Sequence, residues 1–201
     1  MRINFNQLKN AIRYKNSGNL GDFAVLKADA LGAKVHPTLA AQLKPLEGYH
    51  PPIDLQQLSH YSDGSFGREY ARYMQENHLT PFNVSPELDE IAKRNVFALR
   101  YAVTHDIFHV LLGFDTSYAG EIGVLAFAAE QGYSRSLRLS LWLASLLYPL
   151  LAPGQIRAIL NNRRQGRKLG KQAECLLKYR FEDHWHEPID HVKKTLRLST
   201  T

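Results

Sequence analysis

Two histidines and two carboxylic acids form the group of residues best suited to chemistry. His105 and His109 are four residues apart, Asp106 lies between them, and Glu121 follows His109 after eleven residues. Residues four apart on an α-helix differ by about 40° around the axis and about one turn along it, so both imidazoles can reach one ion. Imidazole nitrogens and carboxylate oxygens are common ligands of divalent metals. The spacing therefore predicts a divalent metal site with ligands from these four residues.

The two acids have different expected roles. Asp106 lies about 100° from His105 around the helix, so it can bind the ion directly, bind it through water, orient an imidazole or shuttle a proton. Glu121 can reach the same ion only if the helix that it begins packs antiparallel to the histidine helix. Histidines four apart occur often by chance, but burying several polar groups beside Phe108 and Leu111 would cost on the order of several kcal/mol without a partner such as an ion.

Two known metal signatures compete with this interpretation. A thermolysin-type zinc protease needs His-Glu-x-x-His, and the second position here is Asp106, so we expect no protease. A metal phosphohydrolase of the His-Asp type would combine His105 and Asp106 with an upstream histidine and a downstream aspartate, for which the candidates are His60, His78, Asp183 and Asp190. That alternative leaves His109 and Glu121 without a role, and it predicts that one of the four candidates lies beside His105.

The elements that must position these residues are helices. Ser85, Pro86 and Glu87 are typical of a helix start and Gly113 of a helix end, which predicts one long helix over about 86–112. A second apolar helix is predicted over about 121–131, and the short linker makes the two helices antiparallel neighbours. No alternating strand pattern persists. We therefore expect an all-α fold with a single domain over 1–201, a bundle-like array of about eight to ten helices with an apolar cleft.

Further helices are expected on both sides of this pair. They are predicted at 4–15, 20–31, 37–43 and 66–77, and again at 155–164, 168–184 and 188–198. Residues 137–151 are the most apolar segment, but they contain Arg138 and Pro149 and fall short of the roughly 20 residues that cross a bilayer. We expect a buried helix there, which forms with 122–129 either the walls of the apolar cleft or plain core.

Positive charge gathers in the last third of the chain. The net charge is +6, and residues 134–201 hold 13 Lys and Arg against 5 Asp and Glu, most densely at Arg163, Arg164, Arg167, Lys168 and Lys171. A solvated helix face is the simplest interpretation. Contact with an anionic membrane surface ranks ahead of nucleic acid, because no helix-turn-helix, zinc-finger or base-stacking pattern accompanies the cluster. We expect no nucleic-acid partner.

The cysteine content, the first residues and one polar segment further limit the expected location and metal sites of the protein. Cys175 is the single cysteine, which excludes an internal disulfide and a multi-cysteine zinc site. The first residues show neither a secretory signal nor an anchor, so we expect a cytoplasmic location. Residues 183–191 are rich in histidine and acid, but their spacing does not repeat a complete metal site, so exposed polarity at a helix end explains them better.

The metal pattern has a known counterpart. The run His105-Asp106-Ile107-Phe108-His109, followed after eleven residues by Glu121, resembles the His-Asp-x-x-His-x(11)-Glu signature of the coenzyme Q (ubiquinone) biosynthesis protein four family. The resemblance covers roughly 20–198 and includes a small-residue turn and helix at 64–71 and a Trp-Pro segment at 181–188. His186 stands where that last segment would carry an acid, whereas the metal signature has no departure.

The resemblance implies a function as well as a fold. It implies an all-helical protein on the membrane-facing side of quinone biosynthesis that binds a metal, usually described as zinc, through His105, Asp106, His109 and Glu121. The implied ligand is a polyprenylated ring intermediate, and the implied reaction is removal and oxidative replacement of the C1 carboxyl of a prenylated hydroxybenzoate, a lyase-type decarboxylation and hydroxylation. A second implied role is a non-catalytic, prenyl-lipid-binding scaffold that organises the other quinone biosynthesis enzymes.

Several alternatives stay open at this point. Two imidazoles favour zinc or another transition ion, whereas two carboxylates tolerate magnesium. The ion would act as a Lewis acid on a ring oxygen or carboxylate, but zinc supplies no electron path, which favours the scaffold. A peripheral position on the inner membrane face and a homo-oligomer are both compatible with the sequence.

Overall fold

The computed structural model describes residues 20–30 and 35–199, which are predominantly helical. The helix predicted at 4–15 lies outside the described residues. The helices and 3₁₀ turns are, in chain order, α2 (Leu20–Ala30), α3 (Pro37–Leu43), η1 (Lys44–Leu46), α4 (Leu55–Leu58), α5 (Phe66–Glu76), η2 (Pro86–Leu88), α6 (Asp89–Arg94), α7 (Val96–Val103), α8 (His105–Leu112), α9 (Tyr118–Glu130), α10 (Arg135–Leu151), η3 (Pro153–Gln155), α11 (Ile156–Gln172), η4 (Leu176–Lys178), η5 (Phe181–Asp183) and α12 (Ile189–Thr195).

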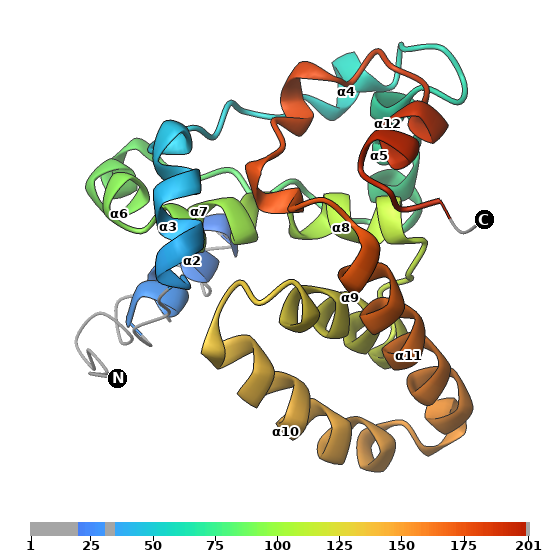
Figure 1. Cartoon of the computed structure of the whole chain (residues 1–201). Coiled ribbons are helices and arrows are strands. Elements are labelled where there is room, and N and C mark those ends of the chain that lie inside the picture. Colours follow the sequence, from blue (N-terminus) through green and yellow to red (C-terminus); the bar gives the residue numbers. More distant parts are fainter. Residues whose placement is uncertain (1–19, 31–34, 200–201) are drawn as a thin grey trace.

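The helices gather in three groups (Figure 1). α9, α10 and α11 lie side by side, and α9 packs most extensively against α11 and next against α10. α2, α3, α6 and α7 form a second group, and α4, α5 and α12 a third. Within the described ranges no strand forms, and β-type pairing is confined to isolated bridges between Val35 and Ser134 and between Ser65 and Pro188. The structure confirms the predicted all-α single domain.

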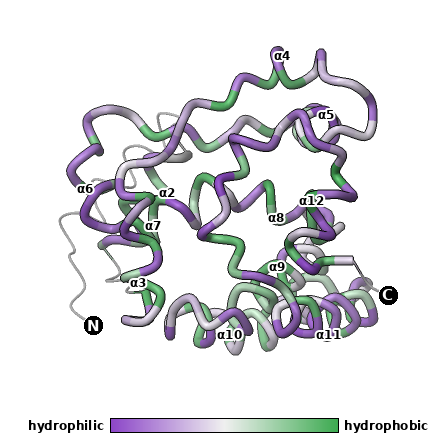
Figure 2. Tube along the Cα trace, turned by 45° about the horizontal axis from the view of Figure 1, so that its top comes forward, coloured by the Kyte–Doolittle hydropathy of each residue, from purple (hydrophilic) through white to green (hydrophobic). Residues whose placement is uncertain are grey.

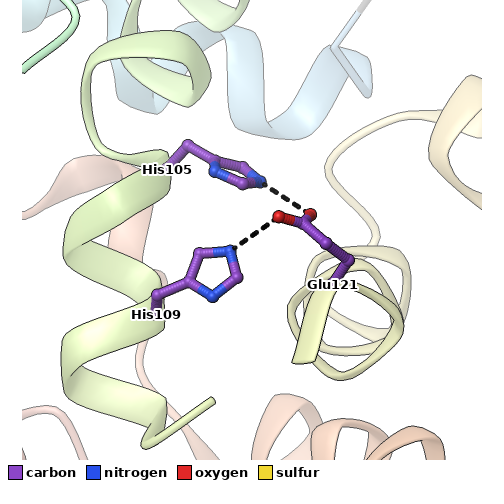
Figure 3. Close-up of side chains that lie close together, drawn as sticks. All are labelled: His105, His109 and Glu121. Atoms are coloured by element: carbon purple, nitrogen blue, oxygen red, sulfur yellow. Dashed lines mark ion pairs between the residues drawn. The ribbon is translucent and has the colours of Figure 1, made fainter. Parts of the chain in front are cut away.

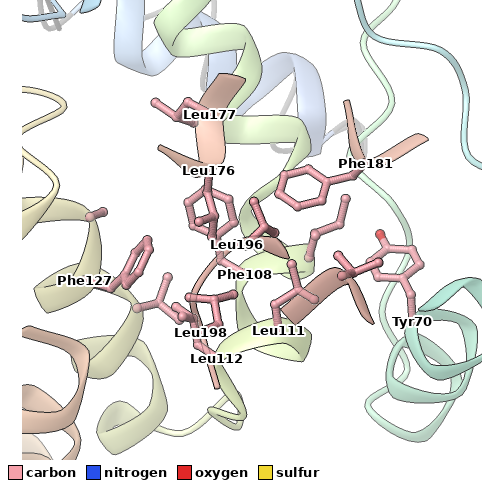
Figure 4. Packing of buried hydrophobic residues seen from close by; sticks show 14 of the residues in the cluster. Tyr70, Phe108, Leu111, Leu112, Phe127, Leu176, Leu177, Phe181, Leu196 and Leu198 are labelled. Carbon is pink, nitrogen blue, oxygen red and sulfur yellow. The ribbon is translucent and has the colours of Figure 1, made fainter. Parts of the chain in front are cut away.

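Apolar side chains from distant parts of the sequence converge in one main core (Figure 4). Phe108 of α8 contacts Phe127 of α9 and Phe181 of η5, with ring centroids 6.0 Å and 6.3 Å apart. The same cluster includes Tyr70, Leu111, Leu112, Leu176, Leu177, Leu196 and Leu198. α9 is hydrophobic along nearly its whole length, whereas α11 is largely hydrophilic (Figure 2). A helix that is apolar all round must be buried, and α9 is enclosed accordingly.

The single long helix predicted over 86–112 is wrong, because two polar residues divide it into α6, α7 and α8. At the first break Asn95 leaves the helical region, its side-chain oxygen accepts from the amide of Ala98, and its amide group donates to Asp29. At the second break the hydroxyl of Thr104 donates to the carbonyl of Arg100 at 2.6 Å. Side chains that bond to nearby backbone compete with helical bonds and bend helices. The predicted apolar stripe therefore continues over three short helices.

α10 is apolar on two opposite faces, and one of them is exposed. On the inner face Ala144 packs with Ile122 of α9 and Ile159 of α11, and Leu137 joins the main core. The opposite stripe, which we call the α10 outer face, consists of Leu139, Trp142, Leu143, Leu146, Leu147, Leu150 and Leu151. The prediction of a buried helix is therefore wrong for one face, although facing residues of α9 and α10 do form packed core. Helical periodicity alone does not say how many faces of a helix find a partner.

The bend after α10 separates two helices that are apolar in part. No single helix within residues 20–30 and 35–199 combines the length and hydropathy needed to cross a membrane. Arg135–Leu151 and Pro153–Gln172 meet those criteria only as a pair, and they are bent by 113°.

α11 is one continuous helix, in place of the two predicted at 155–164 and 168–184. Gly166 does not end it, because this glycine lies where α11 meets α9 and its lack of a side chain permits close approach to the carbonyl of Gly123. Beyond α11 the chain is extended and passes through η4 and η5, so the helix predicted to 184 is wrong. This path brings the carbonyl of Tyr179 and the carboxylate of Glu182 to the guanidinium of Arg100.

Candidate metal centre

α8 places both histidines on one face. The helix begins at His105, directly after the bend at Thr104, and ends at Gly113, whose φ of 71° lies in the left-handed region that favours glycine. His105 is partly exposed in the first turn. His109, one turn later, is 2% exposed. The two rings are 4.9 Å apart between centroids, as the spacing of four residues predicts.

The following loop and α9 bring Glu121 to these rings. The hydroxyl of Ser117 accepts the amide of Gly120 at 3.3 Å, and it donates to the carboxylate of Asp115 at 2.6 Å. This cap starts α9 at Tyr118, three residues earlier than predicted. Glu121 therefore lies in the first turn of α9, where the helix dipole favours an acid.

The three side chains converge on one point (Figure 3). The distance from His109 Nε2 to Glu121 Oε1 is 3.4 Å, and that from His105 Nε2 to Glu121 Oε2 is 3.7 Å. One ligand atom from each of the three residues lies within 4.8 Å of the other two. Both imidazoles point from α8 toward the carboxylate on α9. This donor set is compatible with a divalent cation and does not fix its identity.

The backbone of Phe114 fixes the tautomer of His109. His109 Nδ1 lies 3.1 Å from the carbonyl oxygen of Phe114, and the amide of Phe114 donates to the carbonyl of His109. Because a carbonyl oxygen can only accept, Nδ1 must carry a proton. In neutral His109 the lone pair is therefore on Nε2. That atom is buried and has no hydrogen-bond partner among the residues that the structure describes, since its contact with Glu121 has an ion pair's distance without a hydrogen bond's geometry.

The electrostatics of the pair follow from burial and mutual attraction. Burial is the largest influence on His109 and lowers its pKa, but the carboxylate of Glu121 and the carbonyl of Phe114 outweigh it and raise the pKa above the usual 6.5. Burial likewise raises the pKa of Glu121, but the imidazoles of His109 and His105 bring it below its usual 4.5. Each group therefore stabilises the charged form of the other.

Asp106 does not join the converging atoms. Its Oδ1 lies 3.7 Å from Nδ1 of His105, whereas Nε2 of the same ring faces Glu121. Asp106 is thus placed beside the ring edge opposite the ligand nitrogen. This is the position from which a carboxylate orients a metal-binding imidazole.

Three tyrosines, to which the sequence pattern assigned no chemical role, lie close enough to sense the charge of Glu121. Burial first, and then Glu121, raises the pKa of Tyr101 and of Tyr148. Burial, Asp106 and then Glu121 raise the pKa of Tyr73. The ring of Tyr101 also meets that of His105 edge-on, with centroids 6.0 Å apart. These hydroxyls stay protonated at neutral pH and can donate to an anionic ligand. In the sequence, the spacing of four between Tyr101 and His105 could have indicated that Tyr101 lies beside the site.

A buried ion pair, which the sequence analysis did not predict, joins α7 to the C-terminal segment. The guanidinium of Arg100 is fully buried; Nη1 donates to Glu182 Oε1 at 2.8 Å, and Nη2 donates to the carbonyl of Tyr179 at 2.9 Å. The pair ties the bend at Thr104 to the C-terminal segment. Its signal in the sequence was a single charged residue within the otherwise apolar helix α7.

The residues that the phosphohydrolase alternative required do not join the site. In the part of the chain that the structure describes, the atoms that converge belong to His105, His109 and Glu121, and to none of His60, His78, Asp183 or Asp190. Asp183 instead accepts from the hydroxyl of Tyr49 at 3.1 Å. That alternative therefore loses the geometry on which it depended.

The polar segment 183–191 has a structural role. His184 Nδ1 pairs with Glu187 at 2.6 Å, which lowers the pKa of the glutamate. The carbonyls of Trp185 and Glu187 accept from the first amides of α5, so this segment caps that helix. The indole of Trp185 stacks on Phe66 with centroids 4.6 Å apart.

Comparison with known proteins places this geometry in a family. A model of the family "Coenzyme Q (ubiquinone) biosynthesis protein Coq4" matches residues 50–201, which include every residue of the site. The protein named "Ubiquinone biosynthesis protein COQ4 homolog, mitochondrial" is 31% identical over 159 residues in Xenopus tropicalis, covering 73% of this chain and 51% of that protein. The Homo sapiens protein of the same name is 28% identical over 157 residues, covering 73% of this chain and 55% of that protein.

The comparisons also show how much of the relatives the chain covers and which fold and family it shares. The chain spans about half the length of the curated relatives that it matches. The fold is also similar to the crystal structure of a putative ubiquinone biosynthesis protein from Nostoc punctiforme, with a TM-score of 0.71, 23% identity, and coverage of 98% of this chain and 97% of that one. The family match confirms the resemblance seen in the sequence: the chain belongs to the coenzyme Q (ubiquinone) biosynthesis protein Coq4 family.

Proposed function

We propose that His105, His109 and Glu121 hold one divalent cation, with zinc favoured, and that the chain acts in ubiquinone-type quinone biosynthesis on a polyprenylated ring intermediate. One observation carries the metal assignment: Nε2 of His109 is buried, has no hydrogen-bond partner and lies 3.4 Å from a carboxylate oxygen. Because Phe114 holds the proton on Nδ1, neutral His109 would present a lone pair to a negative oxygen. Positive charge between two such acceptors comes either from a proton on Nε2 or from a cation, and the convergence of His105 on the same carboxylate supports a cation bound by all three residues.

The donor set supports a transition ion over magnesium. Two imidazole nitrogens and one carboxylate suit zinc, which commonly takes three protein ligands and leaves a position open in catalytic sites. Glu121 is 37% exposed, so a substrate can approach the ligand that lies farthest from the core. Asp106 lies 3.7 Å from the other ring nitrogen of His105, where it can orient the ring when the ion is bound, and it can also shuttle a proton.

The proposed reaction is loss of the C1 carboxyl of a prenylated hydroxybenzoate. A bound cation would stabilise negative charge on a ring oxygen or carboxylate of the substrate. The neutral hydroxyls of Tyr101 and Tyr148 can donate to the same anionic groups. The carboxyl carbon leaves as carbon dioxide, its bonding electron pair stays on the ring, and a proton from Asp106 or water replaces it. Oxidative replacement by a hydroxyl would take the place of this protonation: it is a two-electron oxidation in which water supplies the hydroxyl oxygen and molecular oxygen accepts the two electrons and leaves as hydrogen peroxide.

A non-catalytic scaffold is the second candidate. In that case the same site binds the prenylated ring without changing it and presents it to other quinone biosynthesis enzymes. The α10 outer face favours this candidate, because a large exposed apolar surface is typical of a binding surface and has no role in coordinating the metal. Membrane contact and contact with partner enzymes would both use such a surface.

Metal analysis of purified variants tests the site. We expect about one ion per chain in the unmodified protein and in the control His60→Ala/His186→Ala, which removes two histidines outside the site. His105→Ala/His109→Ala should lose the ion. Glu121→Gln keeps shape and volume, so its loss of affinity separates metal binding from folding. Full metal content in the double alanine variant, with circular dichroism unchanged, would refute the assignment.

A labelled substrate separates the two candidate roles. A prenylated hydroxybenzoate carrying ¹³C in its carboxyl group should release labelled carbon dioxide with the unmodified protein and not with Glu121→Gln. Recovery of bound, unchanged substrate from both metal-loaded protein and reaction mixture would favour the scaffold. Mass spectrometry of lipid that co-purifies with the protein identifies the ring and the isoprenoid chain.

A further inference from the structure

Exposed apolar side chains are concentrated at one place on the molecule. Among the described residues, nine of the ten large hydrophobic side chains that are exposed belong to α10 and α11. Seven form the α10 outer face, where exposure reaches 77% at Leu150, and Ile156 and Leu160 continue it on α11. Single exposed leucines are ordinary on a soluble surface, whereas a contiguous patch indicates a binding surface.

The spacing shows that this face is one stripe. Its members recur at intervals of three and four from Leu139 to Leu151, the period of a continuous helical face. The inner face of α10 is already occupied by α9 and α11, so the outer face is a second apolar side. The stripe is most exposed near its end, at the 113° bend that joins α10 to α11.

The charges around the face identify its partner. Between Glu130 and Glu174 the chain contains eight Lys and Arg and no Asp or Glu. Arg135 and Arg138 precede Leu139 and Trp142 by four residues each, so they extend the same stripe at its far end. On α11, Arg164 follows Leu160 by the same interval. The surface is therefore apolar at the bend and basic toward both outer ends.

This pattern fits anionic lipid better than a second copy of the chain. Two copies joined by this face would bring two basic segments together, with no Asp or Glu between Glu130 and Glu174 to offset their charge. A bilayer accepts apolar side chains below its headgroups and attracts Lys and Arg to anionic headgroups. Trp142, which is 60% exposed, has the amphipathic ring that is enriched at the membrane interface.

We propose that the α10 outer face and the adjoining bend insert just below the headgroups of an anionic lipid bilayer, with α10 lying along the membrane surface. The bend is bonded directly to the start of α9. The amide of Ala119 donates to Gln155 Oε1 at 3.1 Å, and Asn162 Nδ2 donates to the carbonyl of Ala119 at 2.9 Å. Docking therefore places Glu121, two residues further along α9, close to the lipid. That a prenylated substrate could reach Glu121 from the lipid rests on the proposed function, whereas the docking itself does not.

Trp142 provides a built-in probe of insertion. The other tryptophan, Trp185, is 9% exposed and stacked on Phe66, so its emission should stay constant. Vesicles of phosphatidylcholine mixed with phosphatidylglycerol should shift the Trp142 emission to the blue, and brominated acyl chains should quench it. Vesicles of phosphatidylcholine alone should bind more weakly, and added salt should weaken binding to the anionic vesicles. Unchanged emission with anionic vesicles would overturn the proposal.

A matched pair of variants separates apolar insertion from simple charge attraction. Leu146→Glu/Leu150→Glu should bind anionic vesicles about 30-fold more weakly, since two exposed leucine side chains no longer enter the lipid. Gln56→Glu/Gln75→Glu lowers the net charge by the same amount at exposed sites on α4 and α5, and it should bind within about threefold of the unmodified chain. Equal losses in both variants would refute insertion of this face.

Two further measurements decide between docking, dimerisation and the proposed metal function. His105→Ala/His109→Ala should bind vesicles like the unmodified chain while losing its metal, so failure of the metal proposal leaves docking intact. Analytical ultracentrifugation without lipid tests the second-copy alternative. A dimer that Leu146→Glu/Leu150→Glu dissociates, together with absence of vesicle binding, would assign the face to self-association and overturn the lipid proposal.

Discussion

Replacing Gly166 with alanine tests whether the close packing of α9 against α11 is essential. A Cβ at this position would overlap the carbonyl oxygen of Gly123 and lie 3.0 Å from its carbonyl carbon and 3.2 Å from the amide nitrogen of Phe127. All three atoms are backbone, so no side chain can rotate away. The two helices would have to separate by about 1 Å, and gaps of that size forfeit roughly a quarter to a half of the dispersion energy at the contact.

The expected magnitude follows from two opposing effects. Overpacking a tight contact costs about 1–3 kcal/mol or more, and a backbone clash falls at the upper end of that range. Alanine in a helix interior returns about 1 kcal/mol relative to glycine. The net destabilisation should be about 2 kcal/mol. For a chain of this length that corresponds to a fall of about 4–8 °C in the midpoint of thermal unfolding.

A graded series of glycines provides the controls. Gly154→Ala meets no atom within 4 Å and should leave the midpoint unchanged or slightly higher. Gly170→Ala would place its Cβ 2.8 Å from the carbonyl oxygen of Phe127 and 2.9 Å from Cβ of Glu130, so an intermediate loss is expected. Thermal unfolding followed by far-ultraviolet circular dichroism measures all three. A Gly166→Ala midpoint within about 1 °C of the unmodified protein would show that the helices are not held at this distance.

Four other predictions concern charge and reactivity. Arg100→Met should lower the free energy of unfolding by about 3–5 kcal/mol in urea titrations, because it leaves the buried carboxylate of Glu182 without a partner. Adding Glu182→Gln should recover a large part of the lost free energy. A double variant as unstable as Arg100→Met alone would contradict this explanation. Metal affinity should fall by about tenfold per pH unit below the raised pKa of His109, because a proton competes for Nε2, and competition with a chelator dye at several pH values measures it. In the metal-free chain the sign is opposite: charged His109 stabilises the fold below its usual pKa of 6.5, and this contribution is lost as the pH rises through the folded value, so mildly alkaline solution should lower the unfolding midpoint. Burial raises the pKa of the Cys175 thiol, so iodoacetamide at mildly alkaline pH should react far more slowly with the native chain than with the urea-unfolded chain; equal rates would show that the thiol is accessible.

The parts of the site that sequence could predict depend on local geometry. A spacing of four places His105 and His109 on one face of any helix, and Gly113 ends that helix at a left-handed residue as its position indicates. Glu121 needed one further assumption, that a short linker folds α9 back against α8. Figure 3 shows α8 from the side and α9 nearly along its axis, so the two helices cross and do not run antiparallel as predicted; Glu121 still reaches the imidazoles, because it lies in the first turn of α9.

The parts that sequence could not predict depend on partners far away in the chain. Thr104 bends the helix with a bond to Arg100, whose own place is set by Glu182, 82 residues later. The same pairing draws 173–184 out of the helix that periodicity indicated. Tyr148 is brought near Glu121 only by the packing of α10 on α9. The sequence of an apolar helix also does not show that one of its faces, here the α10 outer face, is exposed in the described part of the chain.

The ion pair behind α7 also determines how much of the chain is needed for a folded protein. A chain that stopped soon after α11 would retain all residues of the metal centre and the whole of α9, α10 and α11. It would nevertheless lack Glu182 and leave a guanidinium in an apolar interior, at a penalty of about 3–5 kcal/mol, comparable to the whole stability of many small domains. Truncations, premature stop codons or proteolytic nicks in this stretch should therefore yield unfolded protein, however intact the chemistry upstream remains.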